Sequence, residues 1–209
     1  MSLAYKFSAW NRTRKWKLFC RQFVVTKETQ ILDVGFSDNE YSVTDNYLEK
    51  HYSYPEKLTA LGVENPINFS KRYPKVNAVV YAGGKFPFAD KQFDICWSNA
   101  VIEHVGSKEA QVLFIKEMNR VAKQVFFTTP NRYFPVETHT RVPLLHYLPK
   151  TWFDIFLKVI GKEWASGSYM YLLADGDLRC LLNDAEIDNY MIHRNWMFGF
   201  VLDFVVIIK

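Results

Sequence analysis

The chain is poor in the residues that build cross-linked or metal-bound folds. It has three cysteines in 209 residues, and Cys20, Cys96 and Cys180 form no Cys-x-x-Cys pair and no cluster with histidine. This pattern supports neither a disulfide framework nor a zinc site, so we expect no bound metal. Widely spaced, odd-numbered cysteines are typical of a reducing compartment, and we expect a cytoplasmic protein.

Long apolar runs, repeats and flexible linkers are also missing. Residues 1–20 mix basic and aromatic residues without an apolar core, which argues against a signal peptide. The most apolar stretch, residues 198–209, is too short to span a bilayer and contains Asp203. We therefore expect no membrane span and a single domain over residues 1–209.

Neither sign of charge dominates the composition. Lys and Arg number 26 against 22 Asp and Glu, a net charge of +4, which is a weak signal for a nucleic-acid partner. Six of these basic residues lie in the segment 5–24, where apolar residues recur at helical spacing. This predicts an N-terminal helix, with either a solvated basic face or the role of a lid (residues 1–25) over an anionic ligand.

What the sequence does contain is an alternation of apolar runs and amphipathic segments. Short apolar runs without clean alternation are typical of parallel strands covered on both faces. They occupy residues 30–34, 57–63, 77–82, 93–98 and 124–129. Helices are predicted over 108–123, with Ser107 as N-cap, and over 178–186, and two closing strands over 189–194 and 200–209.

This order predicts an α/β fold: a doubly wound, mostly parallel seven-stranded Rossmann-like sheet with an antiparallel edge strand. Residues 130–170 interrupt the alternation with four prolines and many aromatic residues, and we expect an insertion there, after strand 5. Because ligands of such sheets bind at the carboxyl ends of the strands, the site should gather the residues that follow them. These are residues 33–37, 64–65, 82–84, 98–101 and 129–131.

Four segments taken together resemble class I S-adenosylmethionine-dependent methyltransferases, specifically the type 11 group. They are "ILDVGFS" (31–37), "GVEN" (62–65), "YAGGKFPFADKQFDICWSNAVIEHVG" (81–106) and "NRVAKQVFFTTPNR" (119–132). The most specific part is "FPFADKQFDICWSNAVIEHV", which is similar to that group's Pro-Phe turn, Phe-Asp strand opening and Glu-His-Val helix start.

The resemblance implies S-adenosylmethionine as cofactor and methyl transfer as the activity. It implies these cofactor-binding residues: Asp33, Gly35, Phe36 and Ser37 at the methionine part, Glu64 with Asn65 at the ribose hydroxyls, Ala82, Gly83 and Phe86 at adenine, and Asn99 near the sulfonium.

The sequence departs from the family pattern at the first loop and at the adenine edge. Ser37 and Asn39 stand where later glycines are usual, and Ala82 stands where Asp often bonds the adenine amino group. A sulfonium amino acid has no pyrophosphate, so the first glycine, Gly35, can suffice. A catalytically inactive, methyltransferase-like binding or regulatory protein is the alternative. An NAD-dependent oxidoreductase is disfavoured because the later glycines are absent, and a nucleic-acid methyltransferase because the net charge is small.

Two histidines are candidate catalytic residues for proton removal from a methyl acceptor. His104 lies at a helix start after the fourth strand, and His139 lies in the proline-broken insertion expected to cover the acceptor pocket. His146 is interpreted as structural. The expected acceptor is a small molecule, on family analogy alone.

Overall fold

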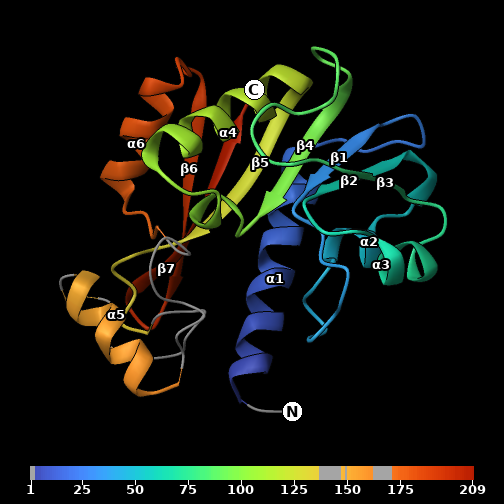
Figure 1. The fold of residues 1–209 in the computed structure, drawn as a ribbon. Coiled ribbons are helices and arrows are strands. Elements are labelled where there is room, and N and C mark those ends of the chain that lie inside the picture. Colours follow the sequence, from blue (N-terminus) through green and yellow to red (C-terminus); the bar gives the residue numbers. More distant parts are fainter. Residues whose placement is uncertain (1–2, 137–146, 149, 162–170) are drawn as a thin grey trace. The chain divides into compact units, whose positions relative to one another are not determined.

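The computed structural model describes residues 3–136, 147–148, 150–161 and 171–209, and Figure 1 draws the remainder as a thin grey trace. A seven-stranded sheet has the order β3-β2-β1-β4-β5-β7-β6. Its strands are β1 Ile31–Val34, β2 Leu58–Gly62, β3 Asn77–Val80, β4 Phe93–Asn99, β5 Ala122–Pro130, β6 Tyr190–Met197 and β7 Phe200–Ile208. Helices flank the sheet, so the predicted Rossmann-like fold class is confirmed.

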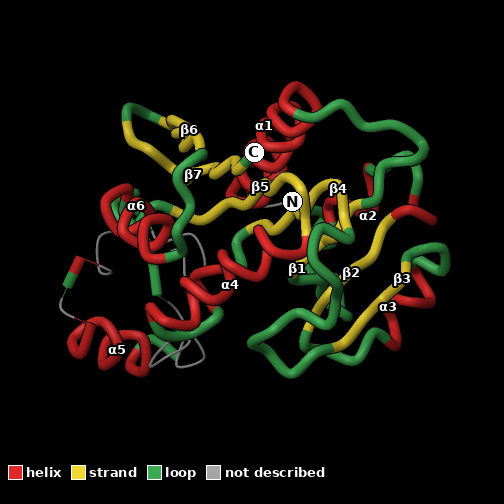
Figure 2. The backbone as a smooth tube through the Cα atoms, turned by 90° about the horizontal axis from the view of Figure 1, so that it is seen from above, coloured by secondary structure: helices red, strands yellow, loops and turns green. Residues whose placement is uncertain are grey.

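The strands at the centre of the predicted site run parallel. β1 pairs with β2 on one side and with β4 on the other, and β2 pairs in parallel with β3; Figure 2 shows β1, β2 and β3 side by side. All four residues of β1 are buried, Asp33 among them, as expected for a strand covered on both faces. The closing strands β6 and β7 pair antiparallel, and β6 runs to Met197, three residues beyond the predicted end.

The helices are α1 Leu3–Gln22, α2 Tyr47–His51, α3 Ile67–Arg72, α4 Lys108–Val121, α5 Lys150–Val159 and α6 Asp175–Asp184, with short 3-10 turns η1 Pro55–Lys57 and η2 Ile102–His104. The predicted helices over 5–24, 108–123 and 178–186 are confirmed as α1, α4 and α6. Ser107 Oγ accepts a bond from the amide of Ala110 at 3.4 Å, as an N-cap does.

Helix α4 ends at Val121, two residues before the predicted end, and β5 begins at once. The ammonium of Lys91 donates to the carbonyl oxygens of Asn119 at 2.7 Å and Ala122 at 2.9 Å. The last carbonyls of a helix lack partners inside it, so this lysine stabilises the abrupt end.

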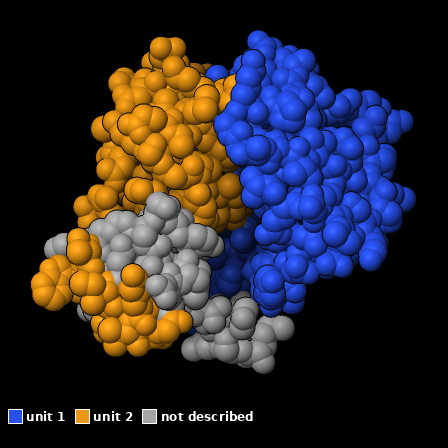
Figure 3. Space-filling view, viewed as in Figure 1, with its two compact units in different colours: residues 1–98, 119–126 blue, residues 99–118, 127–209 orange. Residues whose placement is uncertain are grey.

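The chain divides into two compact units, which Figure 3 colours separately. Unit 1 contains residues 1–98 and 119–126, and unit 2 contains residues 99–118 and 127–209. No helix among the described residues has the length and apolar character needed to cross a bilayer. The organisation as one domain, with residues 130–170 as an insertion, stays a prediction.

An aromatic cluster fixes α1 on the sheet of unit 1. Phe19 of α1 meets Trp97 of β4 and Phe126 of β5 edge-on, at ring-centroid distances of 5.1 and 5.4 Å, and Trp97 stacks on Phe126 at 4.7 Å. Edge-on and stacked aromatic pairs of this kind stabilise the packing of α1 on the sheet beyond the effect of burying the rings. The N-terminal half of α1 extends past the strands of this unit in Figure 1.

Candidate cofactor site

The turn after β1 needs its glycine. Gly35 has φ 108°, a backbone conformation that residues with a Cβ rarely adopt. Its amide donates to the carbonyl oxygen of Leu61 at 2.8 Å, which holds the turn against β2. The residue itself is exposed, so its backbone is open to a ligand at the carboxyl edge of the sheet.

Side chains hold the rest of this loop where other glycines were expected. Asn46, itself in the left-handed region with φ 45°, accepts the amide of Ser37 at 2.9 Å and donates to the carbonyl oxygen of Ser37 at 2.8 Å. Asn39 Oδ1 accepts a bond from Asn68 Nδ2 at 3.1 Å. Asn46, which precedes α2, and Asn68 of α3 therefore hold the loop, to which Ser37 contributes its backbone and Asn39 its side chain.

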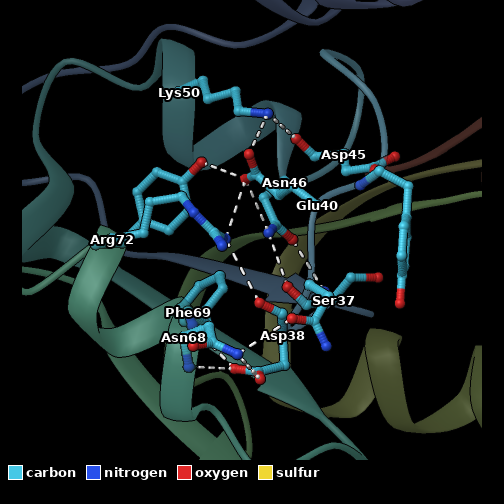
Figure 4. A network of polar contacts seen from close by, with 12 residues as sticks. Ser37, Asp38, Glu40, Asp45, Asn46, Lys50, Asn68, Phe69 and Arg72 are labelled. Atoms are coloured by element: carbon cyan, nitrogen blue, oxygen red, sulfur yellow. Dashed lines mark hydrogen bonds and ion pairs between the residues drawn. The ribbon is translucent and has the colours of Figure 1, made fainter.

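Asp38 joins the loop to α3 and to the end of β2 (Figure 4). Its carboxylate accepts the amides of Asn68 at 2.7 Å and Phe69 at 2.9 Å. The amide of Phe69 foremost, and then that of Asn68, hold the pKa of Asp38 below its ordinary value. The amide of Asp38 in turn donates to Glu64 Oε2 at 2.8 Å. Glu64 is exposed, and its other oxygen makes no hydrogen bond with the described residues.

Glu40 is the centre of the charged part of the network in Figure 4. Its carboxylate meets Lys50 Nζ at 2.9 Å and accepts from the hydroxyl of Tyr73 at 2.6 Å, with Arg72 at 3.6 Å. Burial raises the pKa of Glu40, but the bonds from Tyr73, Lys50 and Asn46 outweigh it and lower the pKa. These contacts join the loop to α2 and α3.

Phe36 lies under the loop and not on its surface. Its side chain is 5% exposed and packs on Phe69 with ring centroids 4.6 Å apart. The ring also covers Gly62, where an added Cβ would lie 2.6 Å from its Cε1 atom. The absence of a side chain at Gly62, the last residue of β2, therefore leaves room for the ring of Phe36.

The predicted adenine edge lies after β3. Ala82 and Gly83 are exposed, and Gly83 has φ 88° with no atom near the position of a Cβ. Phe86, in contrast, is 1% exposed and meets Tyr81 edge-on at 5.4 Å. Arg120 donates to the carbonyl oxygen of Phe86 at 3.0 Å and so holds this loop in place. The backbone of the loop is open to a ligand, whereas the ring of Phe86 belongs to the core.

Beneath the loop, two carboxyl groups are buried beside one another. Asp33 of β1 and Glu49 of α2 are each 6% exposed. Burial raises the pKa of Asp33 to about 6, opposed by a bond with Glu49 and by the charge of Arg12 on α1. Burial foremost, and then the charge of Asp33, raise the pKa of Glu49 well above its ordinary value. Asp33 was expected at the site from its position at the end of the first strand and from the family resemblance, whereas Glu49 was not predicted.

The remaining predicted residues belong to unit 2 or lie outside the described residues. Asn99 Oδ1 accepts from the hydroxyl of Thr128 at 3.1 Å, while its Nδ2 is buried without a partner among the described residues. The amide of His104 donates to the carbonyl oxygen of Val101 at 2.8 Å. His139 and His146 lie outside the described residues. In the described part of the chain no three His, Cys, Asp or Glu side chains gather as a metal site would require.

The sequence reasoning missed Asp38, Asn46 and Asn68 of the network, and also Glu49, on which the charge of Asp33 acts. Asn46 lies 9 positions from the loop residue it holds, and Asn68 lies 30 positions from Asp38. Their polar side chains give no periodic signal, and only the fold brings them together. A partial signal is the distance along the chain from Asp33 to Glu64, which is 31 positions against about 20 in dinucleotide-binding folds.

Comparison with known proteins agrees with this geometry. Residues 46–125 match a family described as methyltransferase domain, Methyltransf_11. The fold is similar to a SAM-dependent methyltransferase from Methanosarcina mazei (TM-score 0.53, 16% identity, 88% of this chain and 92% of that one). It is also similar to a SAM-dependent methyltransferase from Aquifex aeolicus, with a TM-score of 0.56 and 16% identity over 93% of this chain and 88% of that one.

A third similar structure is geranyl diphosphate C-methyltransferase from Streptomyces coelicolor A3(2), solved with Mg²⁺, geranyl diphosphate and S-adenosyl-L-homocysteine. Its TM-score is 0.58, with 10% identity over 95% of this chain and 78% of that one. No curated protein matches the sequence. The predicted resemblance to type 11 methyltransferases is confirmed. The match begins at Asn46 and so leaves out β1 and the loop after it. That loop contains Ser37 and Asn39, at which the sequence departs from the family pattern.

Proposed function

We infer that the chain is a type 11 methyltransferase of the class I fold and that it transfers a methyl group from S-adenosylmethionine to a small molecule. The observation that carries this proposal is the open carboxyl edge of β1 and β2 in unit 1. There an exposed glycine turn, Gly35, lies beside an exposed carboxylate, Glu64, that is joined to the same loop through the amide of Asp38 at 2.8 Å.

The residues present fit the cofactor. One oxygen of Glu64 holds the loop and the other is open to a ribose hydroxyl. The exposed backbone at Gly35 and at Gly83 permits the close approach of a planar or amino-acid group.

S-adenosylmethionine supplies a methyl group on positively charged sulfur, which an acceptor attacks in line. The contribution of this chain is then to orient the two reactants and to exclude water. An acceptor hydroxyl or protonated nitrogen also needs a base, and His139 and His104 are the proposed groups. A His139→Ala protein that turns over its acceptor at the wild-type rate would refute that role for His139.

The small-molecule class of the acceptor rests on two observations. The net charge of +4 is small for a protein whose substrate is a polyanion. A similar structure, the geranyl diphosphate methyltransferase, was solved with a small molecule as its second ligand.

Calorimetric titration with S-adenosylmethionine and S-adenosylhomocysteine tests the proposal. Glu64→Gln keeps an oxygen for the amide of Asp38 and removes the ribose acceptor, so we expect roughly tenfold to hundredfold weaker binding with an unchanged melting temperature. Glu56→Gln, an exposed residue outside the loop network, is the control and should bind as the wild type does. Absence of binding to the wild-type protein at millimolar cofactor would overturn the proposal and favour the inactive-relative alternative.

A further inference from the structure

Helix α1 carries charge of a single sign along its whole length. Its 20 residues include six Lys and Arg and no Asp or Glu. Helices exposed to solvent usually mix acidic with basic residues, because like charges three or four positions apart repel each other. Arg14, Lys17 and Arg21 follow one another at these spacings. The helix therefore loses some stability by remaining wholly cationic, and a negatively charged partner would explain this.

The two sides of α1 differ in burial. The side that packs on the rest of unit 1 repeats every four residues, and Asn11, Lys15, Phe19 and Phe23 on it are at most 9% exposed. The opposite side is a row of residues at alternating spacings of three and four. We call this row the α1 stripe, and it consists of Phe7, Trp10, Arg14, Lys17, Arg21 and Val24.

The ends of the α1 stripe are apolar and exposed. Phe7 is 36% exposed and Trp10 47%, and Val24, which follows the helix, is 91% exposed. The guanidinium of Arg14 lies over the ring of Trp10, 4.6 Å from its centroid, so an aromatic ring and a cation share one position on the surface. In Figure 1 the N-terminal half of α1 extends past the strands of this unit. A flat surface can therefore reach this end of the stripe.

The middle of the α1 stripe is cationic. Lys17 and Arg21 are exposed, and neither forms an ion pair with another residue in the described part of the chain. At a rise of 1.5 Å per residue, the stripe extends about 21 Å from Phe7 to Arg21. A matching partner must present negative charge and apolar groups together over a similar length.

A lipid bilayer with anionic headgroups has both properties. Its phosphates attract Lys and Arg, and the boundary between headgroups and acyl chains takes up Trp and Phe side chains of helices that lie in the plane of the membrane. A nucleic acid fits less well, because its phosphates follow a curved path that one straight row of three cations meets only briefly, and the net charge of the chain is only +4.

We propose that α1 docks the protein on a bilayer that contains anionic lipids, with the α1 stripe facing the membrane. Arg14, Lys17 and Arg21 contact lipid phosphates, while Phe7 and Trp10 enter the boundary between headgroups and acyl chains. The helix lies along the surface and does not cross it. The inference is independent of the proposed function, because no residue of the stripe belongs to the candidate cofactor site.

Sedimentation of the full chain with lipid vesicles measures this binding. One set of vesicles contains phosphatidylcholine alone, and the other contains phosphatidylcholine and phosphatidylglycerol in equal parts. We expect binding to the anionic vesicles and little binding to the neutral ones. Binding should weaken as salt is added, because ions screen the attraction between the lysines and arginines and the phosphates.

Two double variants with the same loss of charge test the position of the site. Lys17→Gln with Arg21→Gln removes two cations of the stripe and leaves the buried side of α1 unchanged. One basic residue near an anionic bilayer strengthens partitioning about fivefold, so this variant should bind roughly thirtyfold more weakly. Lys71→Gln with Lys75→Gln, at two exposed lysines of unit 1 outside α1, is the control and should bind nearly as the wild type does.

A third variant tests the apolar end of the stripe. Trp10→Ala removes the exposed indole and keeps every charge, so it should weaken binding to anionic vesicles roughly tenfold through the lost apolar contact. Melting temperatures of all variants show that each is folded. If the Lys17→Gln, Arg21→Gln protein does not fold, Trp10→Ala and the dependence of wild-type binding on phosphatidylglycerol and salt decide the question.

Three results would overturn the inference. The first is a wild type that stays in the supernatant with anionic vesicles, or that binds neutral vesicles equally well. The second is an equal loss of binding in the two double variants, which would show attraction to net charge and no role for the stripe. The third is tighter binding to a single-stranded RNA than to the vesicles, lost in the Lys17→Gln, Arg21→Gln variant, which would assign the stripe to nucleic acid.

Discussion

The contact between Phe36 and Gly62 can be tested by adding one methyl group. In Gly62→Ala the new Cβ would lie 2.6, 2.7 and 3.1 Å from ring atoms Cε1, Cδ1 and Cζ of Phe36. The ring cannot easily yield, because it is 5% exposed and packs on Phe69 at 4.6 Å. Overpacking of this kind costs about 1–3 kcal/mol, which lowers the melting temperature of a chain of this size by roughly 2–12 °C.

Thermal and urea unfolding of the ligand-free protein would measure the effect. Gly176→Ala is the matched control: it lies in α6, has no atom within 4 Å of the added Cβ, and should unfold at or slightly above the wild-type temperature. Phe36→Leu should relieve the clash, so the double variant should lose less stability than the two single variants combined. A Gly62→Ala protein as stable as the wild type, or strict additivity with Phe36→Leu, would refute the reasoning.

Two further predictions concern the carboxylates of unit 1. Because burial raises the pKa of Asp33 to about 6, its contribution to stability is present below its ordinary pKa and is lost as pH rises through 6. Asp33→Asn should therefore raise the free energy of unfolding of the ligand-free protein at pH 7.5 by on the order of 3 kcal/mol, and leave it unchanged at pH 4. Urea titrations at the two pH values measure this, and an equal change in unfolding free energy at both would contradict it. Asp38→Ala should lower the melting temperature by a few degrees, because it removes the acceptor of the Asn68 and Phe69 amides. Because the pKa of Asp38 is lowered, its contribution to stability is present above its ordinary pKa and is lost as the pH falls through the lowered pKa. If Asp38→Ala melted as far below the wild type at pH 2.5 as at neutral pH, the ionised carboxylate would not be the cause.

The sequence predicted the strands well because their burial determines their composition. Most residues of β1 and β4 are buried, so the two strands appear as largely apolar runs, with Asp33 and Asp94 as their charged members. Helix α4 was predicted from its apolar spacing and the Ser107 cap, both of which are local features. Its last two residues were assigned wrongly because the end of α4 depends on Lys91, which lies 28 positions before the carbonyl it bonds at Asn119.

The site was less predictable because long-range contacts make it. Gly35 and Glu64 follow strands and could be inferred from that position alone. Glu49 could not, because α2 is five residues long and too short for a helical period, and burial of its carboxyl depends on contacts from other elements. The family resemblance implied Phe86 at adenine, yet its ring lies in the core, since a short motif does not determine which way an aromatic side chain points.

The altered loop bears on how a family pattern can change while its function is retained. Successive glycines allow a backbone to approach a ligand, but they also leave the loop flexible, and ordering it costs conformational entropy. Here Gly35 keeps the one positive φ of the turn, while Asn46 and Asp38 fix the residues that follow it. A loop held in this way is preorganised for a ligand, so part of the ordering cost is met on folding instead of on binding. Ser37 takes part in these contacts through its backbone and Asn39 through its side chain, so serine and asparagine at these positions are compatible with a stabilised turn and do not by themselves indicate lost activity.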